Sequence, residues 1–182
     1  AGYSFEDDRK AHLYLASEDY RKIQAIGFDF QNNKITSTAI ALPLKDEDII
    51  STFSDNNSFF IVTLPTDSDN KNKLRFYIFK AGAYKSATVD LSAITILNTA
   101  NKKVNLSSLI GEHGLQKIEQ KGFTALPEAS HKIKFYILKN QMVLTFDHNS
   151  TATTLITIDL QDFTSSEKNI PQPKFDTEAS TN

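Results

Sequence analysis

The stretch LRFYIFK at residues 74–80 returns almost residue for residue as IKFYILK at residues 133–139, and HLYL at residues 12–15 is a weaker echo. In both long stretches successive side chains belong to opposite faces, which is the two-residue period of a β-strand. Repeats spaced by tens of residues are typical of arrays of similar structural units. This recurrence is therefore the most informative feature of the chain.

A second recurring element is an aspartate between apolar residues at the end of a predicted strand. It occurs as FDF at residues 28–30, VDL at 89–91 and IDL at 158–160. These intervals leave room for about four strands in each unit. Aspartate commonly ends a strand by accepting hydrogen bonds from backbone amides of the next turn, so we expect Asp29, Asp90 and Asp159 to be structural rather than to line a binding face.

Period-two alternation predicts most of the chain to be β-structure. The predicted strands are 26–30, 34–41, 49–53, 59–64, 74–79, 84–91, 132–138, 141–146 and 154–160. One segment departs from this pattern, because Leu106, Leu109 and Ile110 share one helical face between Asn105, a possible N-cap, and Gly114. The fold class expected is all-β, mainly antiparallel, with one short helix at Leu106–His113.

Four antiparallel strands in each unit resemble the blades of a β-propeller, in the divergent form of bacterial envelope and secreted proteins. The resemblance covers residues 12–163 and implies about three blade-like units. Closed propellers typically have about four to eight blades, and an open array leaves strand edges exposed. Two alternatives therefore stay open: a propeller segment completed elsewhere, or a β-sandwich or barrel that closes by itself.

The ends of the chain are polar and lack periodicity. We expect residues 1–10 to be a flexible N-terminus, 11–170 to form the antiparallel β repeat domain, and 171–182 to be a flexible C-terminal tail. The sequence begins Ala1-Gly2 without an initiator methionine. A removed leader, a piece of a longer protein and a cloning remnant all explain this start.

Composition excludes several classes of function. A net charge of −2 argues against a dedicated nucleic-acid binder, which usually carries a basic face. The chain has no cysteine, hence no disulfide, thiolate metal site or cysteine nucleophile, and its apolar runs are too short to span a membrane. It contains no HExxH, G-x-S-x-G or P-loop motif. We assign no catalytic residue, no metal and no cofactor.

Two kinds of residue are candidates for binding. Tyr77 and Tyr136 occupy matching positions of the repeat, opposite in facing to Phe76 and Phe135, so they are expected on an exposed or inter-unit surface. Asp67 and Asp69 belong to a polar loop with alternating oxygen ligands, although Lys71 occupies a position where a calcium loop needs an oxygen. A solvated loop is the favoured interpretation of that segment.

The residues expected to form the core follow from the alternation. They are Ile26, Phe28, Phe30, Ile61, Phe76, Ile78, Phe135, Ile137, Leu144, Phe146, Ile156 and Ile158.

The function that these features favour is a non-catalytic protein-binding or scaffold module of a secreted or cell-envelope bacterial protein, part of a larger protein or complex. Its partner would be another protein chain or a second copy of itself, and its location secreted, periplasmic or on the cell surface. The alternative is a ligand-binding or enzymatic β-propeller whose site is completed by sequence outside this chain.

Overall fold

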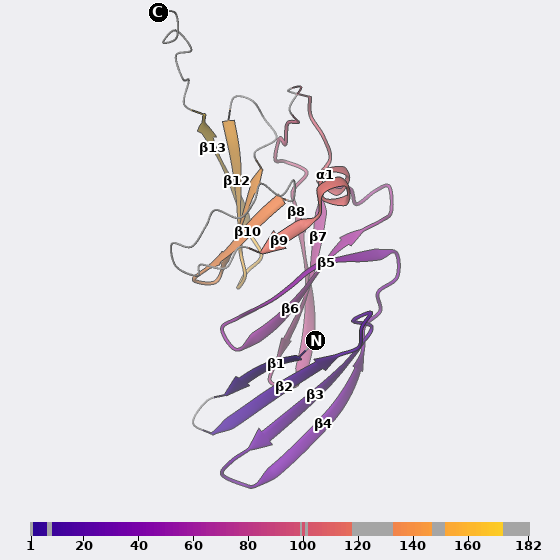
Figure 1. The fold of residues 1–182 in the computed structure, drawn as a ribbon, viewed down its shortest axis with the longest axis vertical. Helices are drawn as coiled ribbons and strands as arrows, with labels where there is room; N and C mark the ends of the chain where they lie inside the picture. Colours follow the sequence, from indigo (N-terminus) through magenta and orange to yellow (C-terminus); the bar gives the residue numbers. More distant parts are fainter. Residues whose placement is uncertain are drawn as a thin grey trace, which may run out of the picture.

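The computed structural model describes residues 2–6, 9–98, 100, 102–117, 133–146 and 152–172. These residues form three separate β-sheets and one helix (Figure 1). The first sheet has the order β1 (Gly2–Glu6), β2 (Lys10–Ala16), β3 (Lys22–Asp29), β4 (Lys34–Ala41). The second has the order β5 (Glu47–Asp55), β6 (Ser58–Pro65), β7 (Lys73–Lys80), β8 (Ala83–Asp90).

The third sheet follows helix α1 (Leu106–His113). Its order is β13 (Ser165–Pro171), β12 (Ala152–Asp159), β11 (Gln141–Phe146), β10 (Ile133–Leu138), β9 (Leu115–Lys117). β9 pairs in parallel with β10, whereas the other strand pairs of the three sheets are antiparallel. The predicted class is confirmed: an antiparallel β-protein with one short helix, built from three blade-like sheets rather than one closed barrel.

The three sheets follow one another along the long axis of the molecule, with the second in the middle (Figure 1). All eight residues of β6 are buried, because both faces of the second sheet are covered. One face packs on the first sheet and the other on the third, and each contact has its own hydrophobic cluster.

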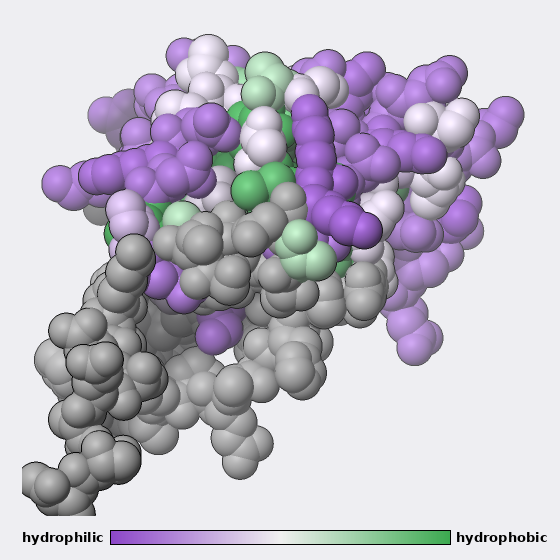
Figure 2. Space-filling view, turned by 90° about the horizontal axis from the view of Figure 1, so that it is seen from above, coloured by the Kyte–Doolittle hydropathy of each residue, from purple (hydrophilic) through white to green (hydrophobic). Residues whose placement is uncertain are grey.

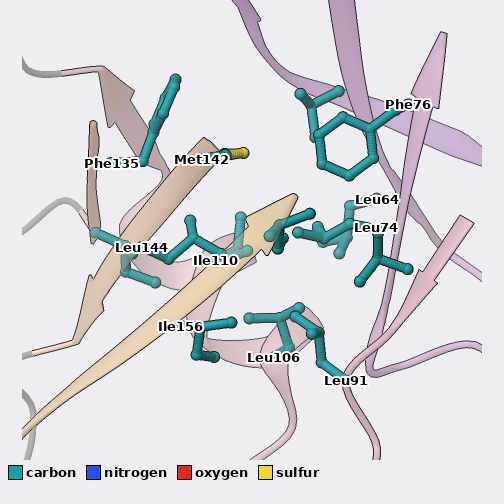
Figure 3. Close-up of a cluster of buried hydrophobic side chains, with 14 of the residues drawn as sticks. Leu64, Leu74, Phe76, Leu91, Leu106, Ile110, Phe135, Met142, Leu144 and Ile156 are labelled. Carbon is teal, nitrogen blue, oxygen red and sulfur yellow. The ribbon is translucent and has the colours of Figure 1, made fainter. Parts of the chain in front are cut away.

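The larger cluster joins the second and third sheets (Figure 3). Phe76 and Leu74 of β7 face Phe135 of β10 and Met142 of β11, and Leu106 of α1 closes one side. The smaller cluster joins the first and second sheets through aromatic rings, with Tyr14 lying 5.9 Å from Phe79 between ring centroids. Burial of this apolar surface is the main force that holds the sheets together.

Helix α1 has the predicted bounds, and Gly114 ends it with a φ of 72° while its amide donates to the Ile110 carbonyl at 2.6 Å. The cap at its other end differs from the prediction. The Asn105 side chain makes no capping hydrogen bond. Instead, Asn72 Oδ1 accepts a hydrogen bond from the Leu106 amide at 3.0 Å, so the loop before β7 satisfies this helix end. Among the described residues no helix is long and apolar enough to cross a membrane.

The structure corrects the facing of β3. Phe30 is 52% exposed and Ile26 and Phe28 are half-buried, whereas Ile23 and Ala25 are buried. The inner face of the first sheet already receives large rings from β1 and β2, and β3 contributes Ile23 and Ala25 to the cluster there. A Cβ added at Gly27 would lie only 2.7 Å from Thr36 Oγ1, which shows how crowded this face is.

The other predicted core residues keep their facing. Eight of them are buried: Ile61, Phe76, Ile78, Phe135, Leu144, Phe146, Ile156 and Ile158. Ile137 is half-buried at the margin of the larger cluster.

The repeat in sequence is not a repeat in position. β7 is the third strand of its sheet, whereas β10 lies next to β9 at one edge of the third sheet. Consequently Phe76 and Phe135 face the same cluster from opposite sides. The matching sequences therefore mark two strands that contribute to one cluster from different sheets, not equivalent strands of two blades.

Residues 2–6, which lie in the segment expected to be flexible, form β1. Tyr3 stacks on Phe59 with 4.1 Å between ring centroids, and its hydroxyl lies 2.7 Å from Thr52 Oγ1. These contacts with the second sheet offset the entropy lost on ordering the chain end. At the other end β13 extends to Pro171, and the predicted tail beyond residue 172 lies outside the described residues.

Candidate functional site

The two predicted tyrosines are not brought together. Tyr77 is buried in the smaller cluster, where its hydroxyl donates to Glu47 Oε2 at 3.0 Å. Tyr136 is half-buried on the opposite face of β10 from Phe135, directed away from the second sheet. Burial is also the main reason that the pKa of Tyr77 lies above its ordinary value. Tyr77 is thus enclosed in the structure, and a binding role for Tyr136 stays a prediction.

Asp67 and Asp69 lie in the loop between β6 and β7. Asp67 Oδ1 accepts from Asn70 Nδ2 at 2.7 Å and from the Asp69 amide at 3.1 Å. Asp69 Oδ1 accepts from Ser68 Oγ at 3.3 Å. The part of the chain that the structure describes contains no group of three His, Asp or Glu side chains that could hold a metal ion. The bonds organise the turn itself, and ligand binding by Asp67 and Asp69 stays a prediction.

The strand-ending aspartates have the structural role that was predicted. Asp29 Oδ1 accepts from the amides of Gln31 and Asn32, each at 3.1 Å. Asp90 Oδ1 accepts from the Ser92 amide at 2.9 Å, and Asp159 Oδ1 from the Gln161 amide at 2.7 Å. Each carboxylate therefore closes the turn after its own strand.

The carboxylates in these turns make the folding stability of the protein depend on pH. Hydrogen bonds from Asn32 hold the pKa of Asp29 below its ordinary value, and those from Ser92 do the same for Asp90. A lowered folded-state pKa contributes stability that is complete above the ordinary value, near about 4, and is lost as the pH falls through the lowered value.

We expect the double variant Asp29→Asn/Asp90→Asn to be less stable than the wild type at about pH 6, with a difference that shrinks below about pH 4. Asparagine resembles the protonated acid in shape and charge, so the two proteins converge once the carboxylates are protonated. Urea denaturation across this pH range measures the difference. A difference that stays constant down to about pH 2 would mean that the lowered pKa values do not contribute.

A buried ionic network joins the first three strands of the second sheet. The Glu47 side chain is 2% exposed and that of Arg75 is 37% exposed, and Arg75 Nη1 donates to Glu47 Oε1. Glu47 Oε2 accepts from Thr63 Oγ1 at 2.7 Å in addition to Tyr77. Three donors thus occupy both carboxylate oxygens. This is the arrangement of a structural ion pair.

A hollow lies between the second and third sheets, at the end where their hairpin turns meet. Its volume is about 640 Å³, within the range of small-molecule sites. Phe60, Ile78 and Leu160 form an apolar floor, and polar side chains surround it. These are Asp55, Asn56, Ser58, Lys80, Lys85, Asn140 and Gln161. Sequence reasoning missed this cleft because its walls come from turns up to about a hundred residues apart; the only local signal was asparagine and lysine at those turns.

The outer face of the first sheet is largely apolar, with Ser4, Gln24 and Ser37 among its apolar side chains. Strand alternation places Leu13 and Leu15 of β2, Ile26 and Phe28 of β3, and Ile35 of β4 on it, opposite to the side chains of the smaller cluster. Leu15 is 43% and Ile35 68% exposed. Among the described strand residues, the same alternation places only two charged ones on this face, Glu6 and Lys22, and both lie toward its margins. By contrast, the surface at the third-sheet end of the molecule, which is seen from above in Figure 2, is mostly hydrophilic among its described residues.

Fold and surfaces together define an open array of three blade-like β-sheets with a cleft between two of them. No protein-family model matches the chain, and a search of curated proteins gives no match.

Among solved structures the chain is similar to a subtype N10 neuraminidase-like protein of A/little yellow-shouldered bat/Guatemala/060/2010. The TM-score is 0.36 and the identity 11%, and the match covers 93% of this chain and 43% of that chain. It is also similar to a GH43 β-1,3-galactosidase with galactodeoxynojirimycin, with a TM-score of 0.29, 15% identity, and coverage of 96% and 42%. The chain spans less than half the length of either structure.

Proposed function

We propose that the chain is a non-catalytic scaffold module that binds another protein chain through the outer face of its first sheet. In the purified protein this partner is a second copy of the chain. The observation that carries the proposal is the run of apolar side chains on that face, with Ile35 68% exposed at its edge. Contiguous exposed apolar surface marks interaction sites on soluble proteins.

Sheet-on-sheet packing is the form of contact that this face suits. The first sheet already packs one face on the second sheet, and the second packs on the third in the same way. A partner sheet on the outer face would continue the stack. Glu6 and Lys22 carry opposite charges on this face, so a second copy can offer each of them its complement.

A non-catalytic role agrees with the hydrogen bonding of the buried Glu47 carboxylate. Glu47 has both carboxylate oxygens occupied by donors, and its neighbour Tyr77 is enclosed. Location in a secreted or cell-envelope protein stays a prediction that rests on the resemblance of the strand units.

Light scattering of the purified chain over a range of concentrations tests the association. We expect a dimer for the wild type and a monomer for Ile35→Lys, with association at least about tenfold weaker, because a lysine at this position is desolvated without a partner. Thr88→Lys, on the exposed edge strand β8, is the matched control and should leave the dimer intact. A wild-type monomer at high concentration, or equal dimers in all three proteins, would refute the proposal.

A further inference from the structure

We propose that the cleft between the second and third sheets binds a phosphorylated polyol, such as a sugar phosphate. This site is separate from the outer face of the first sheet. The cleft measures about 640 Å³ and combines two lysines, one aspartate, side-chain amides and an apolar floor. Each of these groups fits one part of such a ligand.

The wall from the second sheet is built of two adjacent rows of side chains. In the pairing of β6, β7 and β8, Phe60 lies opposite Ile78, and Ile78 lies opposite Lys85. The next row on the same face pairs Asp55 with Ser58 on one side and Lys80 with Ala83 on the other. Alternation directs both rows toward the third sheet, since Phe60 and Ile78 belong to the cluster shared with it.

The two lysines are diagonal neighbours on this face. Lys85 lies opposite Ile78, and Lys80 is two residues further along β7, which places their Cα atoms about 7–8 Å apart. Neither has an ion-pair or hydrogen-bond partner within the described ranges of the chain. Two like charges this close repel each other, so a bound anion relieves the repulsion and gains two charge-assisted hydrogen bonds.

The opposite wall offers groups for hydroxyls. Lys139 and Asn140 both have positive φ, as in the tight turns of hairpins, and the Asn140 carbonyl accepts from the Leu160 amide at 2.7 Å. That bond ties two turns of the third sheet together and fixes the positions of Asn140 and Gln161. Within the described residues the side-chain amides of both have no hydrogen-bond partner, so each can donate to and accept from a hydroxyl group.

The combination favours a phosphate with an attached polyol over simpler ligands. A phosphate ester carries about −1.5 to −2 charges at pH 7, which two ammonium groups can neutralise. Asp55 lies two strands away from Lys80 in its row, roughly 10 Å at the usual strand spacing, so the carboxylate can accept from a hydroxyl without meeting the phosphate. Phe60, Ile78 and Leu160 offer an apolar floor to the carbon skeleton.

Calorimetric titration of the full chain with glucose 6-phosphate, inorganic phosphate, glucuronate and glucose tests the site. We expect glucose 6-phosphate to bind, and at least about tenfold more tightly than inorganic phosphate or glucose, because only it uses both the lysines and the amides. The double variant Lys80→Gln/Lys85→Gln should weaken it at least about tenfold. Lys34→Gln/Lys168→Gln, on strands β4 and β13 and outside the cleft lining, makes the same change in net charge and should leave the affinity unchanged.

Four results would overturn the proposal. They are no binding of glucose 6-phosphate at millimolar concentration, equal binding of inorganic phosphate or glucose, tighter binding of glucuronate, and equal weakening by both double variants. Lys80 and Lys85 are exposed, so their replacement should leave the thermal melting curve in place and a lost affinity reports the site. The titration repeated on Ile35→Lys separates this site from the association of the chain, because that variant keeps the cleft.

Discussion

Replacing Phe135 with alanine is expected to lower the free energy of unfolding by about 3–5 kcal/mol. Phe135 is completely buried in the larger cluster, where its ring centroid lies 5.8 Å from that of Phe53. Truncation removes apolar surface from the core and leaves a cavity between the second and third sheets. Urea denaturation followed by circular dichroism measures the loss.

Phe30→Ala is the matched control, since the same substitution is made at a side chain that is 52% exposed. Its effect should stay within about 0.5 kcal/mol. If the Phe135 variant unfolded at the same denaturant concentration as the wild type, the facing assigned to β10 would be off by one residue.

Arg75→Met is expected to cost about 3 kcal/mol, more than Glu47→Gln. Without Arg75 the Glu47 carboxylate stays buried with no cation, and its side chain is only 2% exposed. Without the Glu47 charge, the Arg75 side chain, which is 37% exposed, can turn to water. The partial exposure of the Arg75 side chain places the cost near the lower end of the range for broken buried ion pairs.

The double variant Glu47→Gln/Arg75→Met distinguishes this explanation from simple loss of packing. It should be more stable than Arg75→Met alone, because the unpaired buried charge is gone. Equal losses in the two single variants, or a double variant at the sum of both, would contradict the coupling.

The strands that were predictable from sequence are those whose alternation coincides with burial. β6 and β7 are rich in apolar residues because both of their faces are covered, and the turns between strands are marked by asparagines with positive φ such as Asn33 and Asn140. β13 was missed because it is an exposed edge strand of sequence SSEKNIP, held by backbone pairing with β12. No side-chain pattern predicts a strand of that kind.

The facing of β3 and the composition of the candidate site depend on contacts between distant segments. Ile26 and Phe28 form as good an apolar alternation as Ile23 and Ala25, and only the rings of the neighbouring strands decide which pair lies inside. The pairing of Glu47 with Arg75 likewise depends on how strands pair within the second sheet, and the presence of Lys80 and Asn140 in one cleft depends on how the second and third sheets stack. A single sequence contains no local sign of such long-range contacts.

The doubly covered middle sheet links two ends of the molecule through one strand. Neighbouring residues Ile61 and Val62 of β6 belong to different clusters, the first shared with the first sheet and the second with the third sheet. When one outer sheet packs on the middle sheet, it orders the backbone of β6, on which the other outer sheet also packs. The entropic cost of packing the other outer sheet is therefore lower. The outer sheets therefore cooperate in folding through a shared template.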